Sequence, residues 1–552
     1  MKIIQLSHRF VSVLVILVVA AAVAGPVPNA SGASVSDTGG RGVVDFDVSC
    51  SEEVQDDFDQ ALALLQHMMY EQARREFQAI IEQAPDCAMA YWGVAMTRFQ
   101  PLWPTRPDTE ALKTGHRKVQ KAVELGPGSE RERALVAAAE AFYREPETAE
   151  WWTRIDRWAD AMKDVYQAHG DDLDVAALYA LSRLSVAPRT EDREAEHAKA
   201  AQVLLDVYRE QPKHPGSIHY TIHANDIGGR AGKSLDVVRS YGEIAPEVPH
   251  ALHMPTHIFV RLGEWPEVIE WNRRSAAAAL EHPAGDRVSH HYPHATGYLL
   301  YSHLQRAEDR KAEKVLEKTL AKGPYQDSFI STFHLSAMPA RYAVERRDWE
   351  DAAQVEPRTP SGLSWDAYPW PVAMSWLARG LGHVHTGALD DARAAEERIA
   401  TLESKTREAG EKGMATYIEI DRRILAGSIA HAEGNDDRAV ELLRSAAELE
   451  GTVEKHPVTP GALLPPYEAL GDLLLDLGRP SEALETYENS LDVWPGRYRS
   501  LLGAARAADA AGKPDAAHEH YAELLDTVGD PAEPRPGVVE AREYIASAAP
   551  AR

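Results

Sequence analysis

Residues 464–495 read LPPYEALGDLLLDLGRPSEALETYENSLDVWP, and this stretch decides the fold. It carries an aromatic residue, a Leu-Gly pair, an alanine with an aromatic residue four places later, and a closing proline, at Tyr467, Leu470, Gly471, Ala483, Tyr487 and Pro495. Small residues let two antiparallel helices approach, and a proline ends the second helix because it lacks a backbone N–H. The stretch therefore predicts a unit of two antiparallel helices.

This spacing is similar to the signature of the tetratricopeptide repeat (TPR), a helix–turn–helix unit of 34 residues. A second unit begins at Tyr498, with Ala517 and Tyr521 in the matching places, and an N-terminal unit begins at Val54. Weaker matches begin near residues 88, 215, 249, 283, 333, 373 and 420. Hardly any segment alternates apolar and polar residues as a strand would. We predict an all-α, TPR-type helical-repeat solenoid in two lobes.

The chain of 552 residues is longer than one compact core usually grows, so the array is expected to divide. Residues 355–371 hold four prolines and two tryptophans and mark the best boundary. A smaller insertion at 451–466 extends one connection between helices. The predicted parts are a signal peptide at 1–24, a flexible lead-in at 25–50, an N-terminal TPR lobe with a histidine-rich groove at 51–350, a linker at 351–371, and a C-terminal TPR lobe at 372–548.

The N-terminus has the features of an export signal. Lys2 and Arg9 supply positive charge, residues 10–23 are apolar, and residues 22–24 read Ala-Val-Ala, a small-residue cleavage site. An uncleaved membrane anchor is the alternative. No second apolar stretch of spanning length follows. We therefore expect an exported protein, periplasmic or secreted, with no membrane span after signal cleavage.

Charge and cysteine content limit the partners and the compartment. The formal net charge of −26 argues against binding to nucleic acid or to an anionic membrane, since both would repel the chain. The two cysteines, Cys50 and Cys87, each come just before the first helix of adjoining repeats. In an oxidising compartment a disulfide between them is natural, and two unpaired thiols are the alternative.

Histidine pairs recur at the length of one repeat. His219 and His223 lie four residues apart, and so do His253 and His257, 34 residues further on. A third cluster at 290–294 follows at the same interval. Residues four apart share one face of a helix. Because neighbouring helix axes pack about 8–10 Å apart, imidazoles of adjacent repeats are expected to reach a common ion.

Neutral imidazoles with a carboxylate suit zinc, copper or iron, which favour nitrogen ligands. Aligning the repeats at residues 215, 249 and 283 selects the candidates. The predicted metal ligands are His219, His223, His253 and His257. Further ligand-binding residues of the groove are His250, His291, His294 and Arg261, where the arginine suits an anionic group. Asp226 is the candidate catalytic base, and it equally suits metal ligation.

The same residues leave other functions open. A metal ion with an open coordination position would acidify a bound water, which predicts a metal-dependent enzyme acting on a small molecule. A TPR groove can also hold a peptide, which predicts a scaffold for protein–protein interaction, with a protein partner on the C-terminal lobe. An organic ligand held by histidine hydrogen bonds, or a purely structural role, is also compatible with the pattern.

Three histidine-rich segments carry a family resemblance: HPGSIHYTIH (214–223), HALHMPTHIFVRLGEW (250–265) and SHHYPH (289–294). Together with DCAMAYWGVAM (86–96) and the following Pro-Leu-Trp, they resemble a group of exported bacterial TPR proteins. The likeness covers roughly residues 50–347. It implies the repeat fold, export, and a ligand-binding groove lined by the first helices, and it leaves the reaction unassigned.

Overall fold

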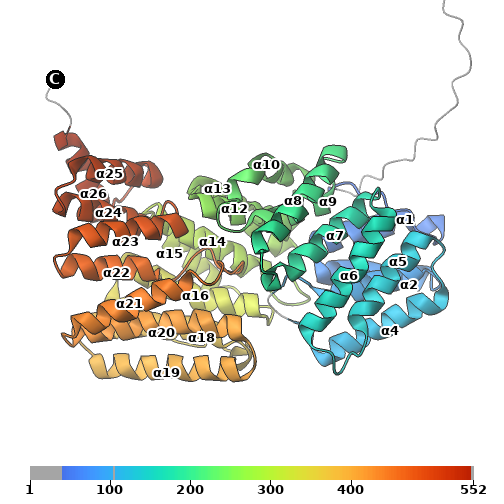
Figure 1. Ribbon diagram of the computed structural model, residues 1–552, viewed down its shortest axis with the longest axis horizontal. Coiled ribbons are helices and arrows are strands. Elements are labelled where there is room, and N and C mark those ends of the chain that lie inside the picture. The colour runs from blue at the N-terminus through green and yellow to red at the C-terminus, as the bar shows by residue number, and fades with distance from the viewer. Residues whose placement is uncertain (1–39, 104–105, 549–552) are drawn as a thin grey trace, which may run out of the picture. The chain divides into compact units, whose positions relative to one another are not determined.

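The computed structural model of the protein describes residues 40–103 and 106–548 (Figure 1). Helices dominate these residues, and extended pairing within them is limited to isolated bridges such as that between Val288 and Tyr325. The prediction of an all-α helical-repeat fold is confirmed. The predicted signal peptide lies outside the described residues, so export stays a prediction.

Helices α1 to α13 build the first part of the array. Their bounds are α1 (Gln55–Gln66), α2 (Tyr70–Gln83), α3 (Ala88–Phe99), α4 (Thr109–Leu125), α5 (Glu130–Tyr143), α6 (Trp151–His169), α7 (Leu173–Val186), α8 (Arg193–Glu210), α9 (Pro215–Asn225), α10 (Leu235–Ile244), α11 (Pro249–His253), α12 (Pro255–Leu262) and α13 (Trp265–Glu281).

Helices α14 to α26 continue it, and successive helices such as α19, α20 and α21 pack side by side (Figure 1). Their bounds are α14 (His291–Gln305), α15 (Asp309–Leu320), α16 (Phe329–Arg346), α17 (Trp349–Ala353), α18 (Pro369–His385), α19 (Leu389–Glu408), α20 (Lys412–Ala432), α21 (Asp436–Glu450), α22 (Pro466–Asp476), α23 (Pro480–Val493), α24 (Tyr498–Ala510), α25 (Pro514–Val528) and α26 (Pro536–Ala548). Short 3-10 helices are η1 (Glu52–Val54), η2 (Ala187–Arg189), η3 (Ala231–Ser234) and η4 (Trp365–Ala367).

The signature residues of 464–495 act as expected. Tyr487 of α23 is buried between Gly471 of α22 and Gly503 of α24. A Cβ atom would come within 2.8 Å of the Tyr487 ring at Gly471 and within 2.3 Å of it at Gly503. The Tyr487 hydroxyl donates to Asp472 at 2.6 Å. The missing side chains therefore make room for the aromatic ring that joins two neighbouring repeats.

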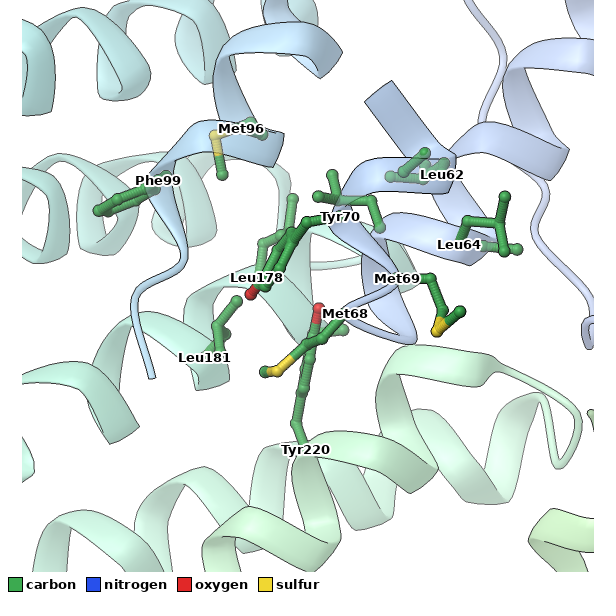
Figure 2. Packing of buried hydrophobic residues seen from close by; sticks show 14 of the residues in the cluster. Leu62, Leu64, Met68, Met69, Tyr70, Met96, Phe99, Leu178, Leu181 and Tyr220 are labelled. Atoms are coloured by element: carbon green, nitrogen blue, oxygen red, sulfur yellow. The ribbon is translucent and has the colours of Figure 1, made fainter. Parts of the chain in front are cut away.

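Apolar side chains from helices far apart in sequence hold α9 in place. Met68, in the turn before α2, lies near Leu178 of α7 and Tyr220 of α9 in the packed interior (Figure 2). Tyr220 is 1% exposed and directly follows His219. Each fully buried apolar side chain of this kind contributes about 1.5–3 kcal/mol. The same core that packs Tyr220 thus fixes the helix that carries the first histidine pair.

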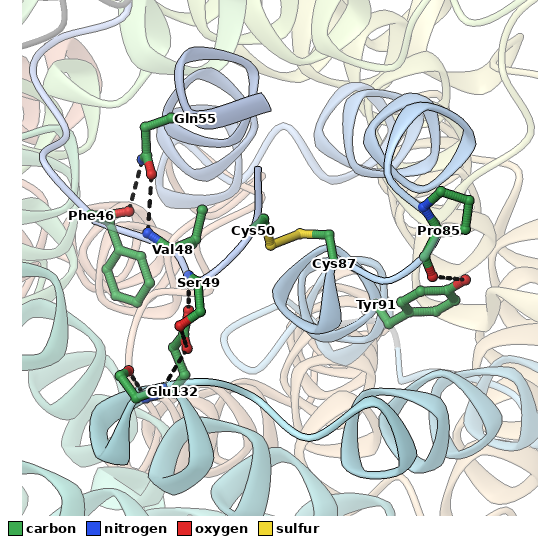
Figure 3. Close-up of a disulfide and its surroundings, with 10 residues drawn as sticks. Phe46, Val48, Ser49, Cys50, Gln55, Pro85, Cys87, Tyr91 and Glu132 are labelled. Atoms are coloured by element: carbon green, nitrogen blue, oxygen red, sulfur yellow. Dashed lines mark hydrogen bonds between the residues drawn. A yellow bond between two sulfur atoms is a disulfide. The ribbon is translucent and has the colours of Figure 1, made fainter. Parts of the chain in front are cut away.

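A disulfide joins Cys50 to Cys87 (Figure 3), so the two cysteines are bridged as predicted and are not unpaired thiols. The segment before it is packed, because Val44 and Phe46 are 0% exposed and the Ser49 backbone N–H donates to Glu132 at 2.7 Å. The lead-in predicted for residues 25–50 stays a prediction, and the structure shows that residues 43–50 pack against the helices. Its composition is poor in large apolar residues overall, but Val44 and Phe46 suffice to bury this part.

The linker region is partly helical and partly buried. Residues 351–371 include the end of α17, all of η4 and the start of α18, and both Trp365 and Trp370 are buried. One large cluster of buried apolar residues draws on residues 44–301, and another on residues 329–517. The boundary between these two clusters thus lies between residues 301 and 329, ahead of the proline-rich segment. The division at 351–371 stays a prediction.

No helix in residues 40–103 and 106–548 combines the length and the apolar character needed to cross a membrane.

Candidate metal centre

Two of the converging histidines flank a break between two short helices. Helix α11 ends at His253 and α12 begins at Pro255, whose ring nitrogen has no proton to continue the helical hydrogen bonds. The His257 backbone N–H donates to the Met254 carbonyl at 3.1 Å instead. His253 and His257 lie on either side of the break, and His294 comes from the first turns of α14.

His253, His257 and His294 form the centre. Each offers one ring nitrogen, and these three nitrogens all lie within 4.8 Å of one another. The Nε2 atoms of His253 and His257 are 3.1 Å apart. Two imidazoles on one tetrahedral zinc ion, with bonds of about 2.0–2.1 Å, place their nitrogens roughly 3.3 Å apart. The observed separation therefore matches ligands that share an ion.

Hydrogen bonds assign the tautomers of His253 and His257. The Nδ1 atom of His257 lies 3.0 Å from Asp226 Oδ2, and a carboxylate only accepts, so this Nδ1 carries the proton. The Nδ1 atom of His253 lies 2.7 Å from Asn272 Oδ1. The Asn272 amide donates to the Val268 carbonyl at 2.8 Å, which turns its oxygen towards His253. Both Nε2 atoms then present lone pairs to each other, an arrangement that a cation between them stabilises.

His294 is held in the same manner by another histidine. Its Nδ1 atom lies 2.6 Å from Nε2 of His334, on α16. When His294 is the donor of this bond, its Nε2 atom is free to bind an ion. Tyr298 packs beside the group, with its ring centroid 4.6 Å from that of His253 and 5.3 Å from that of His294. Partners that orient histidine rings in this way are characteristic of metal sites.

Asp226, which caps the C-terminal end of α9, is clamped by two cations. Arg261 Nε donates to Oδ1 at 2.6 Å, and Lys455 Nζ lies 3.4 Å from the same oxygen. Burial alone would raise the pKa of Asp226, but the charges of Lys455 and Arg261 and the bond from His257 hold this pKa well below its ordinary value. A carboxylate this strongly stabilised is a weak base, so its geometry suits orienting His257 better than the predicted catalytic role.

Burial keeps the histidines of the centre neutral. Desolvation lowers the pKa of His253 and His294 well below the ordinary value, and neighbouring histidines lower it further. The pKa of His257 is also lowered by burial, although Asp226 opposes the shift. Neutral imidazole is the form that binds a metal ion. The centre is therefore ready for an ion at neutral pH without first losing protons.

The other predicted residues lie beside the centre. The ring centroids of His219 and His223 are 5.2 Å apart on α9, and that of His223 is 6.4 Å from that of His257. His250 joins this row, 5.1 Å from His219 and 5.3 Å from His291. Both ring nitrogens of His250 are buried without a hydrogen-bond partner in the described part of the chain. The four predicted metal ligands therefore separate into two pairs, of which only His253 and His257 belong to the centre. The third member of the centre is His294.

The alignment of the third repeat at residue 283 is wrong. Helix α14 begins at His291, eight residues later, because residues 284–287 form a tight turn closed by the bridge between Ala284 and Arg287. Gly285 adopts the left-handed conformation that this turn needs, with φ +65°. His291 and His294 thus occupy the first turns of their helix and not its middle.

The predicted insertion covers the centre. Residues 451–465, called here the 451–465 loop, connect α21 to α22. Tyr298 donates to the Pro457 carbonyl at 2.9 Å, and Tyr417 donates to the Glu454 carbonyl at 2.8 Å. Lys455, whose side chain is 4% exposed, reaches Asp226 from this loop. Sequence reasoning missed Lys455, Asn272 and His334, since none belongs to the repeated histidine pattern.

Comparison with known proteins agrees with the repeat architecture. The tetratricopeptide repeat family model matches residues 58–100 and 468–549, so the chain contains TPR units in both regions. No curated protein matches the chain.

Two solved structures are similar to this chain. The human IFIT1 dimer with PPP-AAAA is 13% identical, with a TM-score of 0.38, over 88% of this chain and 96% of the IFIT1 chain. A tetratricopeptide repeat protein from Parabacteroides merdae is 12% identical, with a TM-score of 0.28, over 54% of this chain and 97% of its own. Likeness at this level carries no argument about function.

Proposed function

We propose that this protein is an exported TPR protein that binds one divalent transition metal ion through His253, His257 and His294. The observation that carries the proposal is the convergence of three buried imidazole nitrogens within 4.8 Å, with the His253 and His257 rings held through their Nδ1 atoms and the His294 ring bonded to His334. Hydrogen bonds of that kind fix ligand direction and raise ligand basicity.

Burial favours a small ion over a peptide at this place. His253, His257 and His294 are 1%, 2% and 6% exposed. A peptide in a TPR groove needs side chains that it can touch, whereas an ion needs only convergent lone pairs. The 451–465 loop, which covers the centre, adds to this exclusion.

The donor set limits the metal to ions that favour nitrogen, namely zinc, copper or iron. Three histidines leave one position of a tetrahedral ion for water or a small molecule, and a bound ion there would act as a Lewis acid. The chain itself supplies the ligand orientation through Asp226, Asn272 and His334. It also supplies the dry surroundings that strengthen these contacts.

Elemental analysis of the mature protein, purified without chelator or reconstituted with zinc or cobalt, tests the proposal. We expect about one metal equivalent per chain. His257→Ala and His294→Ala should each lose the metal, whereas His219→Ala should keep it, because His219 lies outside the compact group. His518→Ala, an exposed histidine on α25, is the matched control.

The outcomes are distinct. Circular dichroism should show the same helix content for all variants, since the repeats pack through apolar residues. A native protein that takes up none of these metals would overturn the proposal. Metal retained by His294→Ala but lost by His219→Ala would instead restore the ligand set predicted from the repeat spacing.

A further inference from the structure

A separate cavity of about 610 Å³ lies next to the 451–465 loop. It is bounded by that loop, by α18 and α20, and by the segment 227–232. Cavities of about 300–1,000 Å³ hold small organic ligands. Its volume is far more than a single metal ion requires, and none of His253, His257 and His294 lines it.

Aromatic rings form one side of the cavity. Trp370 and Tyr417 stack with ring centroids 4.6 Å apart and planes 16° from parallel. His456 meets both rings at steep angles, with its centroid 5.4 Å from that of Trp370. Tyr467 and Trp494 also line the cavity. Such rings bind apolar bodies and, through their negative faces, cations.

Two carboxyl groups without basic partners face the same space. Asp421 of α20 and Glu450, the last residue of α21, line the cavity, and no ion pair among the described residues includes either of them. The Oε2 atom of Glu450 is buried without a hydrogen-bond partner. The Trp494 indole lies close enough to affect Glu450 but makes no hydrogen bond of good geometry.

Burial raises the pKa of both carboxyl groups, because no basic side chain pairs with either. It raises the pKa of Asp421 to about 7, opposed by Trp370 and the charge of Arg341. Burial also raises the pKa of Glu450 to about 8, and the charge of Asp421 raises it further. The two carboxyl groups are therefore within electrostatic reach of each other, and a bound cation would stabilise both as carboxylates.

The remaining charges of the lining also favour a cation. The acids are Asp421, Glu450, Glu454 and Asp492, and the bases are Arg261 and Lys455. Both bases are already used, because they hold Asp226, and Arg261 also contacts Glu454 at 3.3 Å. No basic side chain of the lining is therefore left to pair with Asp421 or Glu450, and a bound cation would take that place.

We propose that this cavity binds an organic ammonium ion, with its charged nitrogen beside Asp421 and Glu450 and its apolar or aromatic body against Trp370 and Tyr417. A neutral ligand of the same shape would use the rings but leave the carboxyl groups without a counter-charge. An anion would oppose the ionisation of both carboxyl groups and would gain no counter-charge from them. The proposal does not rest on the metal centre.

Isothermal titration of the full-length mature protein tests this with phenethylamine and choline as probes. The matched controls are 2-phenylethanol, which is neutral, and phenylacetate, which is an anion. We expect at least one ammonium probe to bind, and 2-phenylethanol to bind at least tenfold more weakly than phenethylamine. At pH 7, binding should release protons, seen as a heat that depends on the buffer, because the cation favours ionised Asp421 and Glu450.

Variants complete the experiment. Glu450→Gln and Asp421→Asn should each weaken ammonium binding at least tenfold, while Glu448→Gln, an exposed neighbour on α21, should not change it. His294→Ala should bind the ammonium probe normally, which separates this site from the metal centre. The proposal is overturned if neither ammonium probe binds, or if 2-phenylethanol binds as tightly as phenethylamine and both carboxyl variants bind like the native protein.

Discussion

Replacing Asp226 with asparagine tests how the centre is built. The Asp226 carboxylate accepts from Arg261 at 2.6 Å and from His257 at 3.0 Å, and Lys455 lies 3.4 Å away. Its side chain is 5% exposed. The Asp226→Asn substitution would keep the shape of the side chain but remove its charge. Lys455 and the oriented imidazole would lose their anion, and Arg261 would keep only Glu454.

The expected magnitudes follow from these contacts. Breaking a buried ion pair by removing one partner costs about 3–5 kcal/mol. Burial already lowers the pKa of Lys455 to about 8, so without Asp226 this lysine would give up its proton near pH 7 and limit the loss. We therefore expect a destabilisation of about 3 kcal/mol, at the lower end of that range. Metal affinity should fall about 10–100-fold, because His257 loses the partner that orients it.

Two assays read these effects separately. Urea unfolding followed by circular dichroism measures stability, and competition of zinc or cobalt with a coloured chelator measures metal affinity. Asp236→Asn, an exposed aspartate on α10, is the control and should change neither. If Asp226→Asn lowers stability but binds metal within threefold of the native affinity, Asp226 does not orient a ligand. If neither stability nor metal affinity changes, the contacts of Asp226 with Arg261, Lys455 and His257 do not have the proposed role.

Three further predictions concern pH, packing and the disulfide. Burial lowers the pKa of His67 to about 4, so between that value and the unfolded value of about 6.5 only the unfolded chain takes up the proton. Lowering the pH of chelator-treated protein from 7 to 5 should therefore cost about 2 kcal/mol at this residue, and His67→Gln should shrink the loss seen in urea unfolding by that amount. Gly503→Ala should lower the urea midpoint because its Cβ would overlap Tyr487, whereas Gly413→Ala, with open space around it, should raise the midpoint. Reducing the disulfide shown in Figure 3 should lower the free energy of unfolding by about 3–4 kcal/mol, measured against protein kept oxidised.

The repeat architecture could be predicted because its signals are local. A helix follows from residues within a few places of one another, and the small and aromatic residues of 464–495 mark how one helix meets the next. The same local rule put His253 and His257 on one side of their segment. The rule did not predict the break at Pro255. The rings of His253 and His257 nevertheless stay together across the break.

Repeat spacing predicted that the third histidine cluster lies near the first two pairs, but not which of its residues joins the centre. It indicated that residues 290–294 would approach the first two pairs, and they do. The tight turn at 284–287 shifts the start of α14, so His294 enters the compact group while His219 and His223 remain beside it. A shift of this kind depends on a loop conformation that repeat counting ignores.

The sequence by itself determined the helices, their pairing in repeats, and the gathering of histidines in one region, since all three depend on contacts between residues near in sequence or one repeat apart. Only the tertiary structure decided which imidazoles share a centre, which carboxylate orients them, and where an aromatic cavity opens. Lys455 reaches Asp226 across 229 residues of chain, and His334 reaches His294 across 40. Such pairings depend on how whole helices and the 451–465 loop pack, because burial and charge act between neighbours in space.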